Sequence, residues 1–399
     1  MINEFNNKTL CIISSKLHWS DPQGIKTTGG FGRQIEQESR YFEKVVLAVP
    51  FREFERPQPG YIIKIKDLEL IPLPYHSGTG AHGKLDSLTK IPRITRLIWQ
   101  SYKRCDVNNY WMSGYVGTIG LLVHKLRRSR PGFTRLGTDW PERIRQTHDT
   151  PVRRFLARIL VLLLPWLMRG LPLFAVGELS SKYGASNPYA HADVQTVLSE
   201  TEIAVEIAFK YANPLRLLYV GRLSVEKGLR YLIEAVSICA KQGIPIHLTL
   251  VGDGEERGQL EFLTVTYGIQ DQVHFTGFVP LGDELRSYYR QANVFVLPSL
   301  SEGVPKVLIE AMASGLHIIA TQVGGIPTLI EDGVNGRLVE PRSAVAIAEA
   351  IQDISREPEA CQQMAKNTLA SAKEYTIEAQ TEQLIKQLQV DFQEIGWVG

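Results

Sequence analysis

A regular alternation of short apolar runs with longer amphipathic segments constrains this sequence most, and it is clearest over residues 215–339. Apolar runs occur at 215–220, 247–251, 294–297 and 317–320, and a glycine comes soon after each. Segments with helical spacing of apolar residues separate these runs. Strands and helices that alternate in this way form a parallel sheet with helices on both faces. The sequence therefore predicts a doubly wound α/β domain that binds ligands at the C-terminal ends of its strands.

The first half repeats the pattern less clearly. Residues 10–14 and 45–49 are strand candidates, and a glycine-rich turn at 28–33 leads into a helical stretch at 34–42 between them. The turn lacks the GxGxxG spacing and the following acidic residue of a dinucleotide site, which argues against a dehydrogenase. A chain of 399 residues exceeds one ordinary domain. We expect two doubly wound α/β domains, at 1–205 and 206–375.

Several further elements are expected from the pattern of apolar and polar residues. A long polar loop follows residue 14, and a second loop covers 76–84. Helical patterns cover 114–126 and 152–168, and a last strand of the first half lies at 194–197. The strand at 133–137 ends beside Asp139, which is either a site residue at a strand end or a turn cap.

Positive charge is concentrated in one segment, although the whole chain carries a net charge of only +2. Residues 84–169 hold 17 Lys/Arg against 5 Asp/Glu. This excess indicates an anionic partner, such as phosphates, a membrane surface or an acidic polymer, or else a solvated basic face. The apolar run at 160–168 is about half as long as a membrane span and is bracketed by Arg158 and Arg169.

The four cysteines are far apart and form no CxxC pair. This usage favours a reducing compartment and no structural metal. The polar first residues do not read as a secretory signal, so we expect a cytoplasmic protein.

Four charged residues follow two of the expected strands. Arg222 and Lys227 lie in one strand-to-helix loop, where two cations can hold a diphosphate. Glu302 precedes a helix that opens at Pro305, and Glu310 lies in the second turn of that helix. Each residue alone could be a surface ion pair, a helix cap or a solvated side chain. Their occurrence together at strand ends favours a site for a ligand with both hydroxyls and negative charge, such as a nucleotide sugar.

The segments 221–228, 251–254 and 298–315 together resemble the donor domain of GT-B fold glycosyltransferases. The resemblance is closest to family 4, the retaining enzymes with two glutamates separated by seven residues, as Glu302 and Glu310 are. It implies two Rossmann-like domains facing across a cleft, the first binding the acceptor and the second binding the donor. It also implies that the helix at 376–399 packs back on the first domain.

The resemblance further implies a role for each matching residue. Arg222 and Lys227 would bind the donor diphosphate and stabilise the leaving nucleotide without a metal. Glu302 would orient the donor sugar, and Glu310 would bind the ribose hydroxyls. Other residues expected at the sugar and phosphates are Gly29, Gly30, Gly303, Val304, Pro305 and Lys306. Many relatives carry a histidine near the position of Asp139, so Asp139 is a candidate contact to the sugar or acceptor.

The resemblance implies a metal-independent, front-face transfer from a UDP- or GDP-linked sugar to a glycan or a lipid-linked acceptor. The basic and apolar residues of 125–169 suggest peripheral contact with an anionic membrane, and no nucleic-acid module is present. Two alternatives stay open. One is a nucleotide-sugar epimerase of GT-B fold, and the other is a non-catalytic protein that binds sugars or anions.

Overall fold

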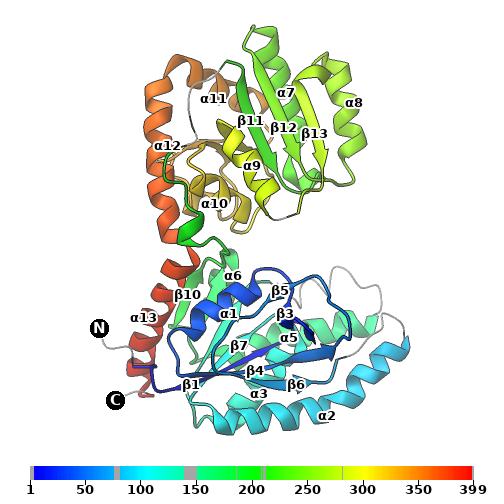
Figure 1. The fold of residues 1–399 in the computed structure, drawn as a ribbon, viewed down its shortest axis with the longest axis vertical. Helices are drawn as coiled ribbons and strands as arrows, with labels where there is room; N and C mark the ends of the chain where they lie inside the picture. Colours follow the sequence, from blue (N-terminus) through cyan, green and yellow to red (C-terminus); the bar gives the residue numbers. More distant parts are fainter. Residues whose placement is uncertain are drawn as a thin grey trace. The chain divides into compact units, whose positions relative to one another are not determined.

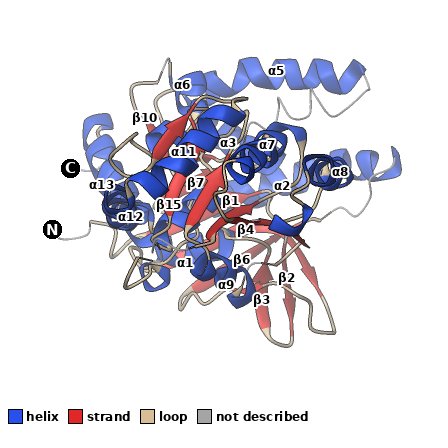
Figure 2. Ribbon diagram, turned by 90° about the horizontal axis from the view of Figure 1, so that it is seen from above, coloured by secondary structure: helices blue, strands red, loops and turns tan. Residues whose placement is uncertain are grey.

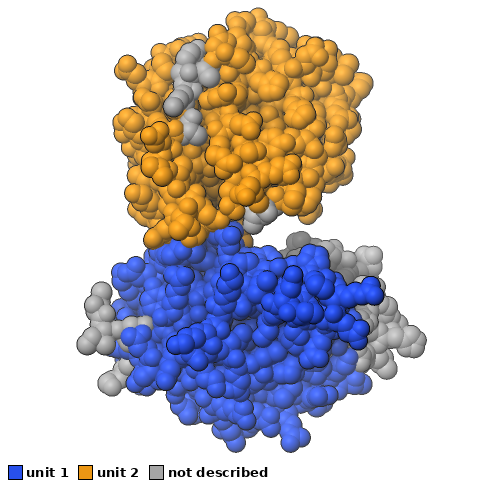
Figure 3. Space-filling model, viewed as in Figure 1, with its two compact units in different colours: residues 1–197, 377–399 blue, residues 198–376 orange. Residues whose placement is uncertain are grey.

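The structure is a computed structural model that describes most of the chain. Described are residues 4–75, 81–138, 151–185, 187–207, 209, 213–280 and 282–397, with backbone alone at 81–88, 151–157 and 178. The chain forms two units (Figures 1 and 3): unit 1 is Met1–Val197 with Ile377–Gly399, and unit 2 is Leu198–Thr376. The sequence places the boundary slightly later, after residue 205. The last helix, α13 (Ile377–Ile395), belongs to unit 1.

Unit 2 is built on one parallel sheet. Its strands are β11 (Leu215–Val220), β12 (Ile246–Val251), β13 (Val273–Gly277), β14 (Val294–Leu297), β15 (His317–Thr321) and β16 (Arg337–Val339). Their order across the sheet is β13-β12-β11-β14-β15-β16. The direction of winding reverses between β11 and β14. In open α/β sheets, ligands bind beside the C-terminal ends of the strands at such a reversal. The four strands predicted for this unit match β11, β12, β14 and β15 within one residue at each end.

Among the described residues of unit 2, four helices connect the strands and two more follow the last strand. They are α7 (Leu229–Lys241), α8 (Arg257–Tyr267), α9 (Asp283–Gln291), α10 (Lys306–Ala313), α11 (Ala344–Arg356) and α12 (Pro358–Ala372). All four residues of β14 are buried, as a strand covered on both faces requires.

Unit 1 also has a mainly parallel sheet. Its strands are β1 (Thr9–Ser14), β2 (His18–Asp21), β3 (Gly24–Thr27), β4 (Lys44–Glu53), β5 (Tyr61–Ile62), β6 (Leu68–Leu73), β7 (Val107–Trp111), β8 (Gly132–Leu136), β9 (Leu173–Val176) and β10 (Ala190–Asp193). The order is β10-β9-β8-β7-β1-β4-β2-β3-β5, with β6 also paired to β4. Among the described strands of this unit, β3 pairs antiparallel with β2 and with β5, and the other pairs are parallel.

The helices of unit 1 cover both faces of this sheet (Figures 1 and 2). They are α1 (Phe31–Ser39), α2 (Ala81–Arg104), α3 (Tyr115–Arg127), α5 (Pro151–Met168) and α6 (Glu178–Gly184), together with α13. Along β1, Leu10 and Ile12 pack with α1 and α13, whereas Cys11 and Ile13 pack with α2, α3 and α5. This alternation is the two-residue period of a strand between two apolar layers.

Four expectations for the first half are wrong. Residues 194–197 are not a strand, because the last strand, β10, ends at Asp193. The loop expected after residue 14 contains the hairpin of β2 and β3, where Lys26 is buried in an ion pair with Asp21 at 2.8 Å. Residues 81–84 belong to α2 rather than to a loop, and 76–80 lie outside the described residues. Helix α1 begins at Phe31, three residues earlier than expected.

Two glycines of unit 2 let the loops at the C-terminal edge touch one another. Gly252 has φ +138°, and a Cβ there would overlap the carbonyl oxygen of Gly221. Gly324 has φ +53°, and a Cβ there would overlap the carbonyl oxygen of Glu302. The loops after β11, β12, β14 and β15 are thus held together by backbone contacts that only glycine permits.

We predict that Gly252→Ala lowers the free energy of unfolding by about 1–3 kcal/mol, because the loops after β11 and β12 must separate. Urea unfolding measures this change. Gly258→Ala is the matched control, since Gly258 lies within α8 and a Cβ there meets nothing within 4 Å. We expect the control to be neutral or stabilising. Equal effects of the two substitutions would contradict the role of close loop contact.

Candidate functional site

The loop after β11 presents the two predicted cations. A short 3-10 turn, Val225–Lys227, follows Arg222, and Gly228 ends the turn with φ +65° before α7 begins. The hydroxyl of the buried Tyr219 donates a hydrogen bond to the carbonyl of Arg222 at 2.8 Å. The backbone is therefore fixed while the Arg222 side chain is exposed and the Lys227 side chain is partly exposed.

The loop after β14 joins the first loop through Glu302. The Lys227 ammonium donates to Glu302 Oε1 at 2.6 Å, and the Ser299 hydroxyl donates to the same oxygen at 2.6 Å. The Glu302 side chain is 10% exposed. In the backbone, the Leu300 amide donates to the Glu226 carbonyl at 2.8 Å. The structure thus brings two predicted site residues, from opposite sides of the winding reversal, into direct contact.

The bond to Glu302 orients the Lys227 ammonium and leaves it able to donate further hydrogen bonds. An ammonium group has three N–H donors, of which the bond to Glu302 uses one. The exposed Arg222 guanidinium lies on the same loop and forms no ion pair with another described residue. The pair of cations at a strand end can therefore still accept a ligand with several anionic oxygens.

Helix α10 begins directly after this loop. Pro305 is its N-cap residue rather than its first helical residue, so the expected position was wrong by one, and no side chain caps the first amides. Gly303 and Lys306 are exposed around this helix start. Gly315 follows the last turn with φ +66°, a left-handed conformation that favours glycine and ends the helix. Exposed amides at a helix N-terminus favour an anion.

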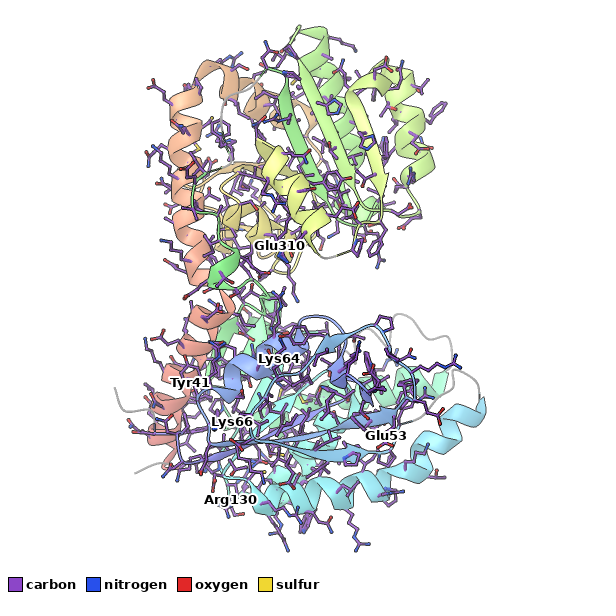
Figure 4. The ribbon with its side chains drawn as sticks, in the orientation of Figure 1. Tyr41, Glu53, Lys64, Lys66, Arg130 and Glu310 are labelled. Atoms are coloured by element: carbon purple, nitrogen blue, oxygen red, sulfur yellow. The ribbon has the colours of Figure 1, made fainter. Side chains whose placement is uncertain are left out.

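Glu310 lies one turn further along α10, next to α9 (Figure 4). The buried Tyr289 of α9 donates a hydrogen bond to Glu310 Oε2 at 2.9 Å. Burial raises the pKa of Glu310 from its ordinary value, and the bond from Tyr289 opposes this rise. Ionised Glu310 is therefore costly to the folded protein, and its carboxylate has a fixed orientation. Both features are typical of a binding residue.

Sequence analysis missed two residues that orient these glutamates. Ser299 and Tyr289 each donate to a predicted site carboxylate. The Thr321 hydroxyl of β15 in turn donates to the Ser299 carbonyl at 2.6 Å. No sequence pattern marks Tyr289, because a tyrosine on the apolar face of a helix is usually a core residue.

The predicted glycine-rich turn lies in unit 1. Gly29 has φ +65°, and Gly30 is the N-cap residue of α1, where a Cβ would overlap Val197. A Cβ on Gly29 would lie 3.9 Å from the Lys16 ammonium, so this turn has a lysine beside it that sequence analysis did not single out. Asp139, the remaining candidate, lies outside the described residues.

A buried ionic cluster fixes α1, and with it the glycine-rich turn. Arg135 of β8 donates to Glu38 of α1 and, at 2.9 Å, to Asp193 of β10. Its guanidinium also stacks on Trp111 of β7 at 4.6 Å. Sequence analysis did not identify this cluster, because its members lie far apart in the chain.

The described residues contain neither a cluster of metal ligands nor a helix that could span a membrane. No group of His, Cys, Asp or Glu side chains there could hold a metal ion. No described helix is long and apolar enough to cross a membrane.

One known protein family matches the part of the chain that contains the candidate site. Residues 201–370 match the family described as Glycosyl transferases group 1. This match lies within unit 2 and contains Arg222, Lys227, Glu302 and Glu310. It covers less than half of the chain.

Curated relatives match over a similar length. An amylovoran biosynthesis glycosyltransferase of Erwinia amylovora is 38% identical over 150 residues, which are 36% of this chain and 37% of the relative. An α-D-kanosaminyltransferase of Streptomyces kanamyceticus is 36% identical over 169 residues, which are 42% and 43% of the two chains. This chain thus spans about four-tenths of the length of these relatives.

Solved structures match over almost the whole chain. HepE of Anabaena, in complex with UDP, matches with a TM-score of 0.62 at 19% identity, over 96% of this chain and 100% of HepE. A glycosyltransferase from Rickettsia africae matches with a TM-score of 0.67 at 15% identity, over 99% and 100%. At such identities the likeness shows the fold, and it confirms the predicted class of two Rossmann-like α/β domains, GT-B.

We predict that Glu310→Gln makes the protein more stable at neutral pH. Because burial raises the pKa of Glu310, the folded protein gains stability from this group at pH values below the unfolded pKa and loses it as pH rises through the folded pKa. Thermal unfolding should therefore give the variant a higher Tm at pH 7. The difference should vanish below about pH 4, near the pKa of an unfolded glutamate. A lower Tm at pH 7 would contradict the buried-charge interpretation.

Proposed function

We propose that this chain is a glycosyltransferase that moves a sugar from a nucleotide diphosphate sugar to a hydroxyl group of a glycan or a lipid-linked acceptor. The contact of Lys227 with Glu302 at the winding reversal of unit 2 carries the proposal. It combines a cation for a diphosphate with a carboxylate for sugar hydroxyls in one place. The family match over residues 201–370 supports the same activity.

Unit 2 binds the donor in this proposal. Arg222 and the two remaining N–H groups of Lys227 hold the diphosphate, and the exposed amides at the start of α10 add partial positive charge. Glu302 orients the sugar, while Glu310, oriented by Tyr289, accepts hydrogen bonds from the ribose. The UDP in the HepE complex supports a UDP-linked donor, with a GDP-linked donor as the alternative.

The transfer is proposed to retain the anomeric configuration, as in family 4. The bond between the anomeric carbon and the diphosphate oxygen breaks, and the acceptor oxygen bonds to the same face of that carbon. The acceptor proton passes to the departing phosphate oxygen, so no side-chain base is needed. Arg222 and Lys227 stabilise the charge that develops on the leaving diphosphate, which is the task that a metal performs in other transferases.

Unit 1 binds the acceptor in this proposal, with Gly29 and Gly30 approaching the donor phosphates. The amylovoran relative is named for the biosynthesis of a polysaccharide, which supports an acceptor that is a growing glycan. We place this activity in the cytoplasm, with peripheral contact at the inner face of the membrane.

Replacing single site residues tests the assignment of roles. We expect Lys227→Ala, Arg222→Ala and Glu302→Ala each to lower kcat at least about 100-fold, because each removes a group that stabilises or orients the reacting atoms. Release of nucleotide diphosphate in the presence of acceptor measures the rate, and circular dichroism checks the fold. Lys241→Ala is the charge-matched control, since Lys241 is exposed at the other end of α7.

Two outcomes would contradict this scheme. Full activity of Lys227→Ala would overturn the diphosphate assignment. A converted nucleotide sugar formed from donor alone, without acceptor, would instead identify an epimerase.

Removing the Tyr289 hydroxyl tests how Glu310 is oriented. We expect Tyr289→Phe to raise the KM for the donor about five- to tenfold and to leave kcat nearly unchanged, because the loss is about one hydrogen bond to a ground-state ligand. Initial rates over a range of donor concentrations separate the two constants. A fall in kcat with constant KM would place Tyr289 in the chemical step instead.

A further inference from the structure

Two neighbouring helices of unit 1 expose large apolar side chains to solvent. Helices α3 and α5 pack against each other, and Figure 2 shows α5 along the outside of the fold. Leu126 of α3 is 77% exposed and Leu162 of α5 is 80% exposed. The other exposed apolar side chains of these helices are Leu122, Ile159 and Trp166. On α5 these residues recur at helical spacing, so they form one face.

A cationic pocket lies at the C-terminal ends of the same two helices. Its volume is about 250 Å³, and Lys125, Arg128 and Arg169 line it. The remaining lining residues are His124, Leu167, Gly170, Leu171, Ile395 and Trp397. None of the lining residues is acidic, so the pocket offers positive charge and apolar walls.

The three cations lack an anionic partner within the described part of the chain. Among the ion pairs there, none includes Lys125, Arg128 or Arg169. Cations are favoured near helix C-termini in general, but here three cations line a single pocket. Burial lowers the pKa of Lys125, and the charges of Arg128 and Arg169 lower it further. A bound anion would relieve this repulsion.

Lys125 and Trp166 connect the pocket to the apolar face. The Lys125 ammonium lies 4.9 Å from the centre of the Trp166 ring and donates to the Trp166 carbonyl at 3.1 Å. Trp166 is 53% exposed. Exposed tryptophan beside cations and leucines is characteristic of segments that lie in the interface of a bilayer.

We propose that this surface docks unit 1 on an anionic lipid bilayer. Leu126, Leu162 and Trp166 enter the boundary between headgroups and acyl chains, and the pocket of Lys125, Arg128 and Arg169 binds the phosphate of one lipid. A free anion fits the pocket but leaves the apolar face exposed, and a neutral bilayer leaves the cations unpaired. An anionic lipid surface satisfies both features. The inference deepens the membrane contact in the proposed function and rests on it, although the docking residues belong to unit 1 and the donor residues to unit 2.

Flotation of the full-length protein with lipid vesicles tests the proposal. Vesicles of phosphatidylcholine alone are compared with vesicles of equal parts phosphatidylcholine and phosphatidylglycerol, at low and at high salt. We expect flotation only with the anionic vesicles and a marked loss at high salt. Arg128→Ala and Arg169→Ala should each weaken partitioning about fivefold, and Leu162→Asp should weaken it at least as much.

Matched substitutions in unit 2 provide the controls. Phe262 of α8 and Lys241 of α7 are exposed like the residues they control for, so Phe262→Ser and Lys241→Ala should float like wild type. Circular dichroism and a nucleotide-dependent rise in Tm confirm that each variant is folded and keeps its donor site. Loss of flotation with normal donor binding therefore separates docking from transfer.

Any of four results would overturn the proposal. The first is no flotation of wild type at low salt, and the second is equal flotation of Leu162→Asp and wild type. The third is a dimer in light scattering that Leu162→Asp dissociates, because a second copy would then cover the apolar face. At matched ionic strength, phosphate should displace the protein from vesicles better than chloride does, and equal displacement would contradict a phosphate-binding pocket.

Discussion

The ion pair between Lys227 and Glu302 is the interaction on which the proposed site depends. It joins the loops after β11 and β14, the two strands between which the sheet of unit 2 reverses its winding. The pair is reinforced by Ser299 on the side chain of Glu302 and by a backbone bond from Leu300 to Glu226. Because both loops are fixed before any ligand binds, little conformational entropy remains to be lost when a donor enters.

Glu310, the second glutamate of the site in unit 2, is held by contacts of a different kind. Glu302 forms an ion pair with Lys227, whereas Glu310 is partly buried beside the hydroxyl of Tyr289 and has a raised pKa. An ionised carboxylate of this kind is unfavourable in the free protein and becomes useful when hydroxyl groups of a ligand bind to it. The two glutamates therefore differ in physical role, although their spacing in the sequence suggests a matched pair. Neither arrangement resembles an acid and base poised for proton transfer.

Much of unit 2 could be predicted from sequence, because β14 and β15 are buried along their whole length and glycines follow β11, β12 and β15 closely. Residues 215–220 and 294–297 were predicted at their observed bounds. The elements of the first half were harder to predict from sequence, because β2 and β3 are short. No local sequence pattern indicates the contacts of Lys26 with Asp21 and of Arg135 with Asp193. For the site, Lys227 and Glu302 were expected together, but their direct bond and the roles of Ser299 and Tyr289 depend on packing between elements. The helix and the apolar run of α5 were predicted from sequence. The pocket beside α5 was not, because residues of α3 and α13 contribute to it.

A crystal structure of this protein with UDP bound tests the central claim most directly. We expect diphosphate oxygens within hydrogen-bond distance of Lys227 Nζ and the Arg222 guanidinium, with the start of α10 beside them. We also expect that the ribose hydroxyls donate to Glu310, while Lys227 keeps its bond to Glu302. UDP bound in unit 2 without contact to Lys227 or Glu310, or UDP bound outside this edge of the sheet, would contradict the account.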